Sequence, residues 1–226
     1  MPVCALDLLC RAAIIRPIYY DVRLFPGRMN SHLQYNLVIT MQQIELDQKA
    51  EWLRGVRQVP SPNHDERPEG AAIELLVIHG ISLPPGQFAG NYIDALFTNS
   101  LDPELHPYFR EIAGRKVSAH VLINRAGEIT QYVPFNRRAW HAGVSTFQGR
   151  TCCNDFSIGI ELEGCDDQPY TDNQYTALAG LSRVLCGQWA AITKDRIVGH
   201  CHIAPDRKTD PGPSFDWQYY FKLLGC

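Results

Sequence analysis

The residues best suited to chemistry lie in one loop near the carboxyl end of the chain. The segment from 199 to 212 carries His200 and His202 together with Lys208 and Asp210. Imidazole nitrogens and carboxylate oxygens are common zinc ligands, and a lysine ammonium can stabilise negative charge that develops during a reaction. Because an apolar Ile-Val pair precedes the loop and prolines interrupt it, we expect His200 at the end of a strand and the rest in turns. This loop can therefore hold a metal.

A second histidine is expected at the end of another strand. Residues 75–78 form a continuous apolar run, which predicts a buried strand that delivers His79 at its end. A hydrolytic zinc keeps three protein ligands and leaves a fourth position for water. His79, His200 and Asp210 could supply that set. On the residues alone, other histidines compete for the same role, namely His202, His120 and His141.

One carboxylate is predicted to project from a strand. Residues 157–163 alternate cleanly, so that Ile158, Ile160 and Leu162 face one way while Glu161 faces the other. If Glu161 points at the metal, it is the natural group to take a proton from the attacking water and pass it to the leaving amine. Lys208 lies two residues before Asp210 and could stabilise an oxyanion in the same cavity.

Other segments predict the elements that must position these residues. A hairpin is expected where residues 121–124 and 128–133 flank an Arg-Ala-Gly turn. Thr171 and Gln174 resemble a capping box that opens a helix with an apolar stripe, and Asp216 could cap a last helix. Residues 92–97 could form another helix. The sequence therefore predicts an α/β (α+β) fold with helices on a mixed central sheet.

Composition limits the kind of protein and its partners. The chain has 226 residues, of which 45% are hydrophobic and 20% charged, and this favours one soluble domain. A formal net charge of -3 argues against a nucleic-acid or anionic-membrane surface, so we expect a small-molecule partner. We also expect a monomer. The cysteines show no disulfide framework and no CxxC pair, and we expect mostly free thiols in a reducing compartment.

The first forty residues differ from the rest of the chain. Their apolar run is interrupted by charged residues and no basic segment precedes it, so neither a signal peptide nor a membrane helix is predicted. We expect residues 1–40 to form a loosely ordered extension. We also hypothesise that Met41 is the biological start, with the domain at residues 41–226.

Alternative chemistries leave weaker signals. The sequence has no GxSxG elbow, no GxxxxGK[ST] phosphate loop and no HExxH helix. A cysteine nucleophile paired with a histidine is not excluded by spacing. A structural zinc on Cys201 and the Cys152-Cys153 pair is another alternative, although these thiols lack the short-spaced pairs of such sites.

Four segments follow one another along the chain: Val77–Gly86, Arg138–Gly143, Asn154–Gly164 and the loop at 199–212. In sequence and in order they resemble the amidase-2 family, and within it the AmpD type of cytosolic 1,6-anhydro-N-acetylmuramyl-L-alanine amidase of Gram-negative bacteria. The likeness runs from about residue 52 to 217. This resemblance implies a peptidoglycan-recognition-like fold with zinc in a surface groove. It also implies a cytoplasmic enzyme that hydrolyses the amide between 1,6-anhydro-N-acetylmuramic acid and the L-alanine of the stem peptide during cell-wall recycling.

The resemblance assigns roles that spacing leaves open. His79, His200 and Asp210 match the family's zinc ligands, Glu161 its proton acceptor and Lys208 the lysine that stabilises the transition state. The position of His202 is commonly an aspartate in relatives and is not a ligand there. His120 and His141 fall outside the metal set, and His141 is expected to shape the groove.

The resemblance also implies substrate contacts, and here the chain departs from the family. The expected substrate-binding positions are Gly80, Lys116, Cys152 and Asn154. Gly80 replaces a usual asparagine, whereas Lys116 and Cys152 stand where relatives tend to carry arginines, so the bidentate grip on acidic groups is lost. Two other functions stay open: a non-catalytic muropeptide-binding module, and an exported wall amidase, which would need an export signal.

Overall fold

A mixed six-stranded sheet forms the centre of the described chain. The computed structural model describes residues 18–26 and 35–225, with side chains from residue 44 onward. The strand order is β14-β7-β13-β8-β9-β5. β14 is parallel to β7, β7 is parallel to β13, and β13 is parallel to β8. β9 is antiparallel to β8. The strands are β5 (Arg57–Gln58), β7 (Leu75–Ile81), β8 (Val121–Ile123), β9 (Ile129–Gln131), β13 (Ser157–Glu163) and β14 (Ile197–Gly199). The predicted mixed sheet and hairpin are confirmed.

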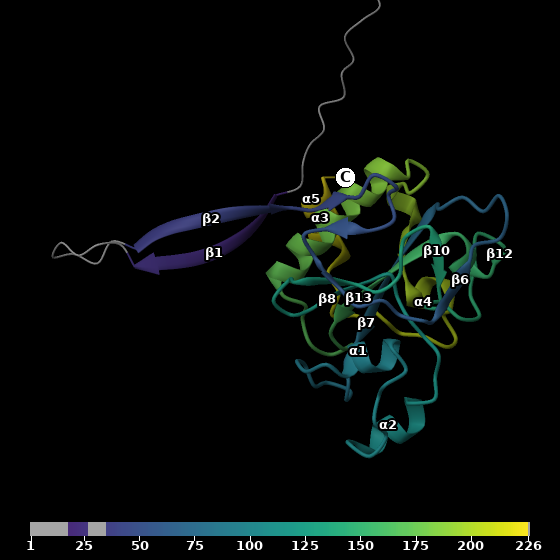
Figure 1. Cartoon of the computed structure of the whole chain (residues 1–226). Coiled ribbons are helices and arrows are strands. Elements are labelled where there is room, and N and C mark those ends of the chain that lie inside the picture. The colour runs from purple at the N-terminus through teal and green to yellow at the C-terminus, as the bar shows by residue number, and fades with distance from the viewer. Residues whose placement is uncertain (1–17, 27–34, 226) are drawn as a thin grey trace, which may run out of the picture.

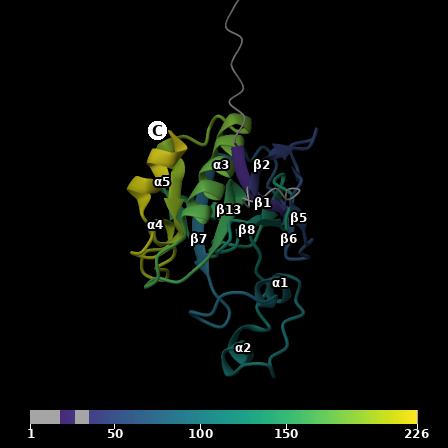
Figure 2. The same cartoon turned by 90° about the vertical axis from the view of Figure 1, so that its left-hand side faces the viewer.

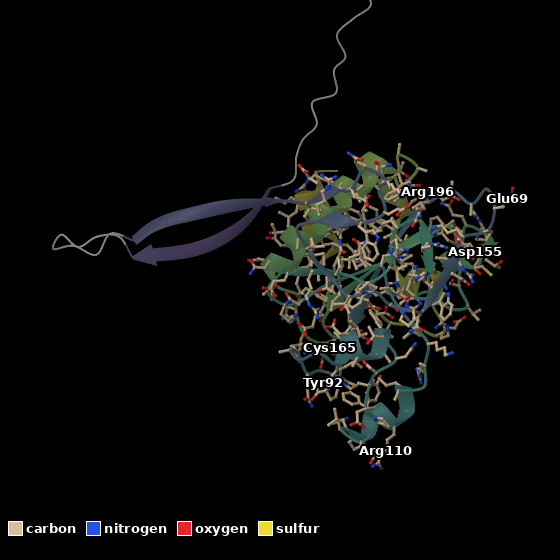
Figure 3. All side chains as sticks on the ribbon, in the orientation of Figure 1. Glu69, Tyr92, Arg110, Asp155, Cys165 and Arg196 are labelled. Atoms are coloured by element: carbon tan, nitrogen blue, oxygen red, sulfur yellow. The ribbon has the colours of Figure 1, made fainter. Side chains whose placement is uncertain are left out.

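Helices cover this sheet and extend one end of the molecule. α3 (Asp172–Gln188) and α5 (Trp217–Leu224) lie beside each other, and α3 crosses in front of the strands in Figure 2. α1 (Tyr92–Phe97) and α2 (Pro107–Ile112) lie at the lower tip in Figure 1 and build a second apolar cluster. Tyr92 and Arg110 mark these two helices in Figure 3. The short α4 (His200–Ile203) directly follows β14.

The alternation of β13 decides which face of the sheet is core and which face carries polar groups. Ile158, Ile160 and Leu162 are fully buried in the main apolar cluster with residues of α3 and α5. Glu161 points to the opposite face and stands beside His79 of β7 in the parallel register. Because side chains alternate along a strand, one face of β13 packs against the helices and the other face carries Glu161.

Two helix starts follow the predicted capping chemistry. The Thr171 hydroxyl accepts from the backbone N–H of Gln174, and the Gln174 side chain accepts from the backbone N–H of Thr171. Asp216 caps α5 by accepting from the N–H of Tyr219 at 2.8 Å. Each satisfies amides that a helix leaves unpaired at its start. α2 was not among the helices predicted from the sequence.

Short elements complete the fold around the sheet. β6 pairs antiparallel with β10, β3 with β4, and β11 with β12. Their bounds are β3 (Glu45–Leu46), β4 (Leu53–Arg54), β6 (His64–Glu66), β10 (Arg137–Ala139), β11 (Thr146–Phe147) and β12 (Arg150–Thr151), and the 3-10 turns are η1 (Cys153–Asp155) and η2 (Lys194–Arg196).

The region before residue 44 contains paired strands where the sequence predicts a loose extension. β1 (Ile18–Pro26) pairs antiparallel with β2 (Tyr35–Gln43), and the pair projects from the body in Figure 1. Both strands are rich in β-branched and aromatic residues, which favour extended backbone. Residues 1–17 and 27–34 lie outside the described residues. The start at Met41 stays a prediction, and Met41 lies within β2 opposite Tyr20.

Within residues 18–26 and 35–225, no helix is both long and apolar enough to cross a membrane.

Candidate active site

Three side chains converge beside the sheet. The Nδ1 atoms of His79 and His200 lie 2.9 Å apart, and each lies 3.1 Å from Oδ2 of Asp210. Both imidazoles are almost fully buried, and Asp210 is half-buried. Among the described residues these three form the only His, Cys, Asp or Glu group compact enough to hold a metal ion.

Neighbouring parallel strands bring these side chains together. His79 lies within β7, two residues before its end, and β14 pairs with β7 along Ile197–Gly199. The expectation that His200 ends a strand needs a small correction, because β14 ends at Gly199 and His200 opens α4. Asp210 returns to the same place through a backbone bond in which the N–H of Cys201 donates to its carbonyl at 2.9 Å.

The facing atoms of the cluster are better suited to binding a metal ion than to hydrogen bonding with one another. His200 Nε2 lies 3.1 Å from the carbonyl of Ala142, which can only accept, so the ring proton is on Nε2 and the Nδ1 lone pair faces the cluster. The carboxylate of Asp210 also has only lone pairs to offer. A tetrahedral zinc bound at about 2.1 Å holds its ligand atoms roughly 3.4 Å apart. The observed separations are close to that spacing.

The electrostatics of the cluster favour neutral imidazoles beside an ionised carboxylate. Burial lowers the pKa of His79 to about 4. Burial alone would raise the pKa of Asp210, but hydrogen bonds with His200 and His79 hold it far below its usual range. Neutral histidine and ionised aspartate are the forms that bind metal ions.

Glu161 stands next to this cluster with an oxygen that has no partner. Its Oε2 atom is buried and makes no hydrogen bond, which is rare for a native polar group. Burial and the carboxylate of Asp210 raise its pKa well above the usual range, while Lys208 opposes the rise. A carboxylate with a raised pKa and an open oxygen is a strong proton acceptor.

Lys208 is held in the loop between α4 and Asp210. Its backbone N–H donates to the carbonyl of Ala204 at 3.0 Å, and its side chain is half-buried. Its charge lowers the pKa of both His79 and Glu161, so the ammonium acts on the cluster from nearby. The lysine therefore contributes positive charge that is felt by both His79 and Glu161.

The rival histidines are not members of the three-residue cluster. His202 is exposed, and its Nδ1 accepts from the N–H of Gly199 at 2.9 Å. His120 is buried, with Nδ1 accepting from the N–H of Gly159. His141 lies behind His79, where its Nδ1 is 2.9 Å from Nε2 of His79. Among the described residues, no cysteine belongs to a group of side chains that could hold a metal ion. Cys152, Cys153 and Cys201 carry free thiols.

The expected substrate-binding residues fall into different surroundings. Lys116 and Cys152 are exposed, and Cys152 adopts the left-handed backbone region at φ 59. Gly80 follows His79 in β7, where a Cβ would overlap the hydroxyl of Tyr170. Asn154 is half-buried, and its Oδ1 accepts from the N–H groups of His141 and Ala142 at 3.2 and 2.8 Å. Tyr170 and the Asn154 bonds carry no sequence signal, since they join segments distant along the chain.

Comparison with known proteins identifies the family. The family described as N-acetylmuramoyl-L-alanine amidase matches residues 69–213, which include the cluster of His79, His200 and Asp210 as well as Glu161. The chain belongs to the N-acetylmuramoyl-L-alanine amidase family. The cluster of His79, His200 and Asp210, with Glu161 beside it, is thus the candidate active site of an amidase.

Individual relatives of this amidase share most of its length. The 1,6-anhydro-N-acetylmuramyl-L-alanine amidase AmpD of Escherichia coli K12 is 63% identical over 173 residues, covering 76% of this chain and 94% of that protein. The AmpD protein of Salmonella typhimurium SL1344 is 61% identical, with coverage of 76% and 92%. A crystal structure of a selenomethionine AmpD derivative superposes with a TM-score of 0.77 at 58% identity, covering 80% of this amidase and 99% of that chain.

Proposed function

We propose that this chain is a zinc-dependent 1,6-anhydro-N-acetylmuramyl-L-alanine amidase. It would cut the amide between 1,6-anhydro-N-acetylmuramic acid and the L-alanine of the stem peptide, and so act in cell-wall recycling. The observation that carries the proposal is the meeting of His79, His200 and Asp210 beside Glu161. The substrate class is supported by the AmpD relatives and by the E. coli amidase AmiD, 28% identical at TM-score 0.51, whose complex holds an anhydro-N-acetylmuramic acid peptide.

Zinc suits the donor set of this site. Two imidazole nitrogens and one carboxylate oxygen are ligands that zinc accepts, and three protein ligands are typical of catalytic zinc sites. His79, His200 and Asp210 would hold the ion. When bound, zinc supplies a Lewis acid that polarises the amide carbonyl and activates water.

Glu161 is proposed as the residue that moves the proton. Hydrolysis of an amide needs a base for the attacking water and an acid for the departing amine. The unpartnered Oε2 can accept the first proton, and the raised pKa of the carboxyl keeps that proton available for the amine of L-alanine. A single side chain thus serves both halves of the reaction.

Lys208 is proposed as the group that stabilises the carbonyl oxygen. Negative charge grows on that oxygen as water adds to the amide carbon, and a fixed ammonium lowers the energy of this state. The backbone bond from Lys208 to Ala204 fixes the main chain of the lysine two residues before Asp210. This supports a role for its ammonium beside the cluster.

We propose that the grip on the stem-peptide carboxylates is weaker than in relatives that carry arginines at positions 116 and 152. Lys116 has a positive charge but not the planar guanidinium that binds a carboxylate through two hydrogen bonds, and Cys152 has neither the charge nor that group. A Cys152→Arg variant is expected to bind an anhydromuramyl-tripeptide more tightly, as measured by its KM. An unchanged KM would contradict this part of the proposal. The enzyme is further proposed to be a cytoplasmic monomer acting on small muropeptides.

The deciding experiment compares the zinc-loaded protein with a Glu161→Ala variant. Both are incubated with anhydromuramyl-tripeptide, and release of free peptide is followed by chromatography. We expect release by the wild type and a fall of about 10²–10⁴-fold in the variant, because proton transfer is lost. A Glu128→Ala variant changes an exposed carboxylate and serves as the control.

Two outcomes contradict the proposal in different ways. No release by the zinc-loaded wild type would favour the muropeptide-binding module instead. Equal release by the wild type and the Glu161→Ala variant would remove Glu161 from the mechanism while leaving the amidase in place.

A further inference from the structure

Both histidines of the metal cluster are oriented by two adjacent residues. His79 Nε2 lies 2.9 Å from Nδ1 of His141, and His200 Nε2 lies 3.1 Å from the carbonyl oxygen of Ala142. The far nitrogen of a metal-binding histidine usually donates to such a partner, which fixes the ring and its tautomer. The dipeptide His141-Ala142 therefore controls how both imidazoles face the metal.

The direction of the bonds behind His79 is fixed by a carbonyl at their end. The Ser157 hydroxyl donates to the carbonyl of Cys153 at 2.6 Å, so its oxygen is left to accept from Nε2 of His141 at 3.1 Å. With the proton of His141 on Nε2, its Nδ1 can only accept from Nε2 of His79. This order leaves the Nδ1 lone pair of His79 facing Asp210 and the metal position.

The backbone of this dipeptide is held by one side chain. Oδ1 of Asn154 accepts from the N–H of His141 at 3.2 Å and from the N–H of Ala142 at 2.8 Å. No neighbouring strand provides these two bonds, because β10 ends at Ala139. Without Asn154, both amides would lose the acceptor that sets the position of the His141 ring and of the Ala142 carbonyl.

Asn154 is itself fixed from behind. The half-buried guanidinium of Arg67 donates to the carbonyls of Asn154, Asp155 and Ser157 at 3.1, 3.0 and 2.8 Å. Asp155, labelled in Figure 3, marks this segment. The His141 ring packs over Gly159, where a Cβ would overlap it. The support behind the metal cluster is therefore continuous from Arg67 to the two imidazoles.

We infer that Asn154 is a positioning residue of the metal site, which acts through His141 and Ala142 to set the orientation of both His79 and His200. Ser157 completes the device by fixing the proton of His141. This role differs from the substrate contact expected for Asn154 from sequence, because its amide oxygen is already used by two backbone N–H groups. The inference rests on the metal site proposed above.

The test measures zinc affinity by competition with a chromophoric chelator. We expect Asn154→Leu to bind zinc about 10–100-fold more weakly than the wild type, since support of this kind typically contributes that much. Asn154→Asp retains the accepting oxygen and is expected to bind as the wild type does. Asn136→Leu, at an exposed asparagine, is the matched control.

A spectroscopic measurement separates positioning from general stability. Nitrogen-15 NMR of the zinc-loaded wild type is expected to show His79, His200 and His141 all with the proton on Nε2. Ser157→Ala should disturb the His141 signal and weaken zinc binding. Because the wild-type spectrum needs no variant, it tests the inference even if Asn154→Leu fails to fold.

The outcomes that overturn the inference are distinct from failure of the proposed function. A wild type that does not bind zinc removes the metal site itself. A wild type that binds zinc overturns the inference alone if Asn154→Leu binds equally well, if Asn154→Asp is as weak as Asn154→Leu, or if His141 carries its proton on Nδ1.

Discussion

Glu161 and His79 stand opposite each other on the parallel strands β13 and β7, with both side chains on the same face of the sheet. This pairing joins the proposed proton acceptor to the proposed metal through backbone hydrogen bonds of the central sheet. Their relative position therefore does not depend on a flexible loop. Groups held on strands are positioned more accurately than groups held on loops.

The charge of Lys208 is expected to act on the rate and not on binding. A Lys208→Met variant should lose about 10²–10³-fold in kcat with a small change in KM, because the ammonium is needed only when charge develops on the carbonyl oxygen. Steady-state kinetics with anhydromuramyl-tripeptide measures both constants. Lys222→Met, at an exposed lysine of α5, is the control. A rise in KM at constant kcat would assign Lys208 to substrate binding instead.

Removing the metal is expected to lower stability. The three proposed ligands come together only in the folded chain, so zinc binds the native state and stabilises it by about 4 kcal/mol when its concentration is 1,000 times Kd. Calorimetry with and without chelator should show this difference as a fall in the unfolding midpoint. Asp210→Asn should reduce the fall, whereas Asp206→Asn, an exposed carboxylate of the same loop, should leave it unchanged. A midpoint insensitive to chelator would contradict the metal site.

Stability is expected to decrease in acid partly because of His120. Burial, together with the nearby charge of Arg67, lowers the pKa of His120 to about 3 from its ordinary value of 6.5. Below pH 6.5 His120 therefore binds a proton in the unfolded chain but stays neutral in the folded chain. The free energy of unfolding decreases as pH falls towards 3. The loss approaches about 1.4 kcal/mol per pH unit for one such group.

A His120→Asn variant tests this pH dependence. Its side chain does not titrate and can still accept from the N–H of Gly159. Urea unfolding should find the variant less stable than the wild type at pH 7.5, with a smaller difference at pH 5.5. Parallel pH profiles would show that His120 does not carry the effect.

The glycine after His79 is predicted to be required by Tyr170. The Tyr170 hydroxyl donates to the carbonyl of Pro211 at 2.8 Å, next to Asp210, and a Cβ on Gly80 would overlap that hydroxyl. Gly80→Ala should therefore destabilise the fold by about 1–3 kcal/mol, the usual range for overpacking. In a Tyr170→Phe background the destabilisation should be smaller, and a double-mutant cycle in urea measures the coupling.

Gly114→Ala is the control for this experiment. A Cβ at Gly114 meets no atom within 4 Å, and its φ is not positive, so the change should have little effect. Additive effects of Gly80→Ala and Tyr170→Phe would contradict the predicted overlap.

A chain that begins at Met41 is expected to fold. The central sheet and the family match at residues 69–213 lie after this point, whereas β1 and most of β2 lie before it. Circular dichroism should give an unfolding midpoint equal to that of the full chain. A marked fall in the midpoint would show that the β1–β2 pair contributes to the stability of the domain.

Local patterns predicted much of the fold because their causes are local. The alternation of residues 157–163 and the capping residues Thr171 and Asp216 act over a few positions, and β13, α3 and α5 appear where those patterns place them. The likeness to a family then assigned the cluster of His79, His200 and Asp210, which spacing alone left open among rival histidines.

The support behind the cluster could not be predicted in the same way. Asn154 reaches residues 12 and 13 positions earlier, and Arg67 reaches carbonyls 87 to 90 positions later. Such contacts depend on how the sheet brings separate segments together, and no periodicity records them. The paired strands before residue 44 were not predicted for a different reason, since Pro17, Pro26 and Gly27 and the lack of clear periodicity favoured a loose extension.

The placement of β14 at the edge of the sheet has a consequence for synthesis of the protein. His79 and Asp210 are 131 positions apart, and β14, which directly precedes His200, pairs with β7 alone among the described strands. A ribosome-bound chain that has emerged only as far as α3 holds a single member of the cluster. Capture of the proposed metal would therefore follow nearly complete translation, and the ion would stabilise a finished domain instead of guiding its assembly.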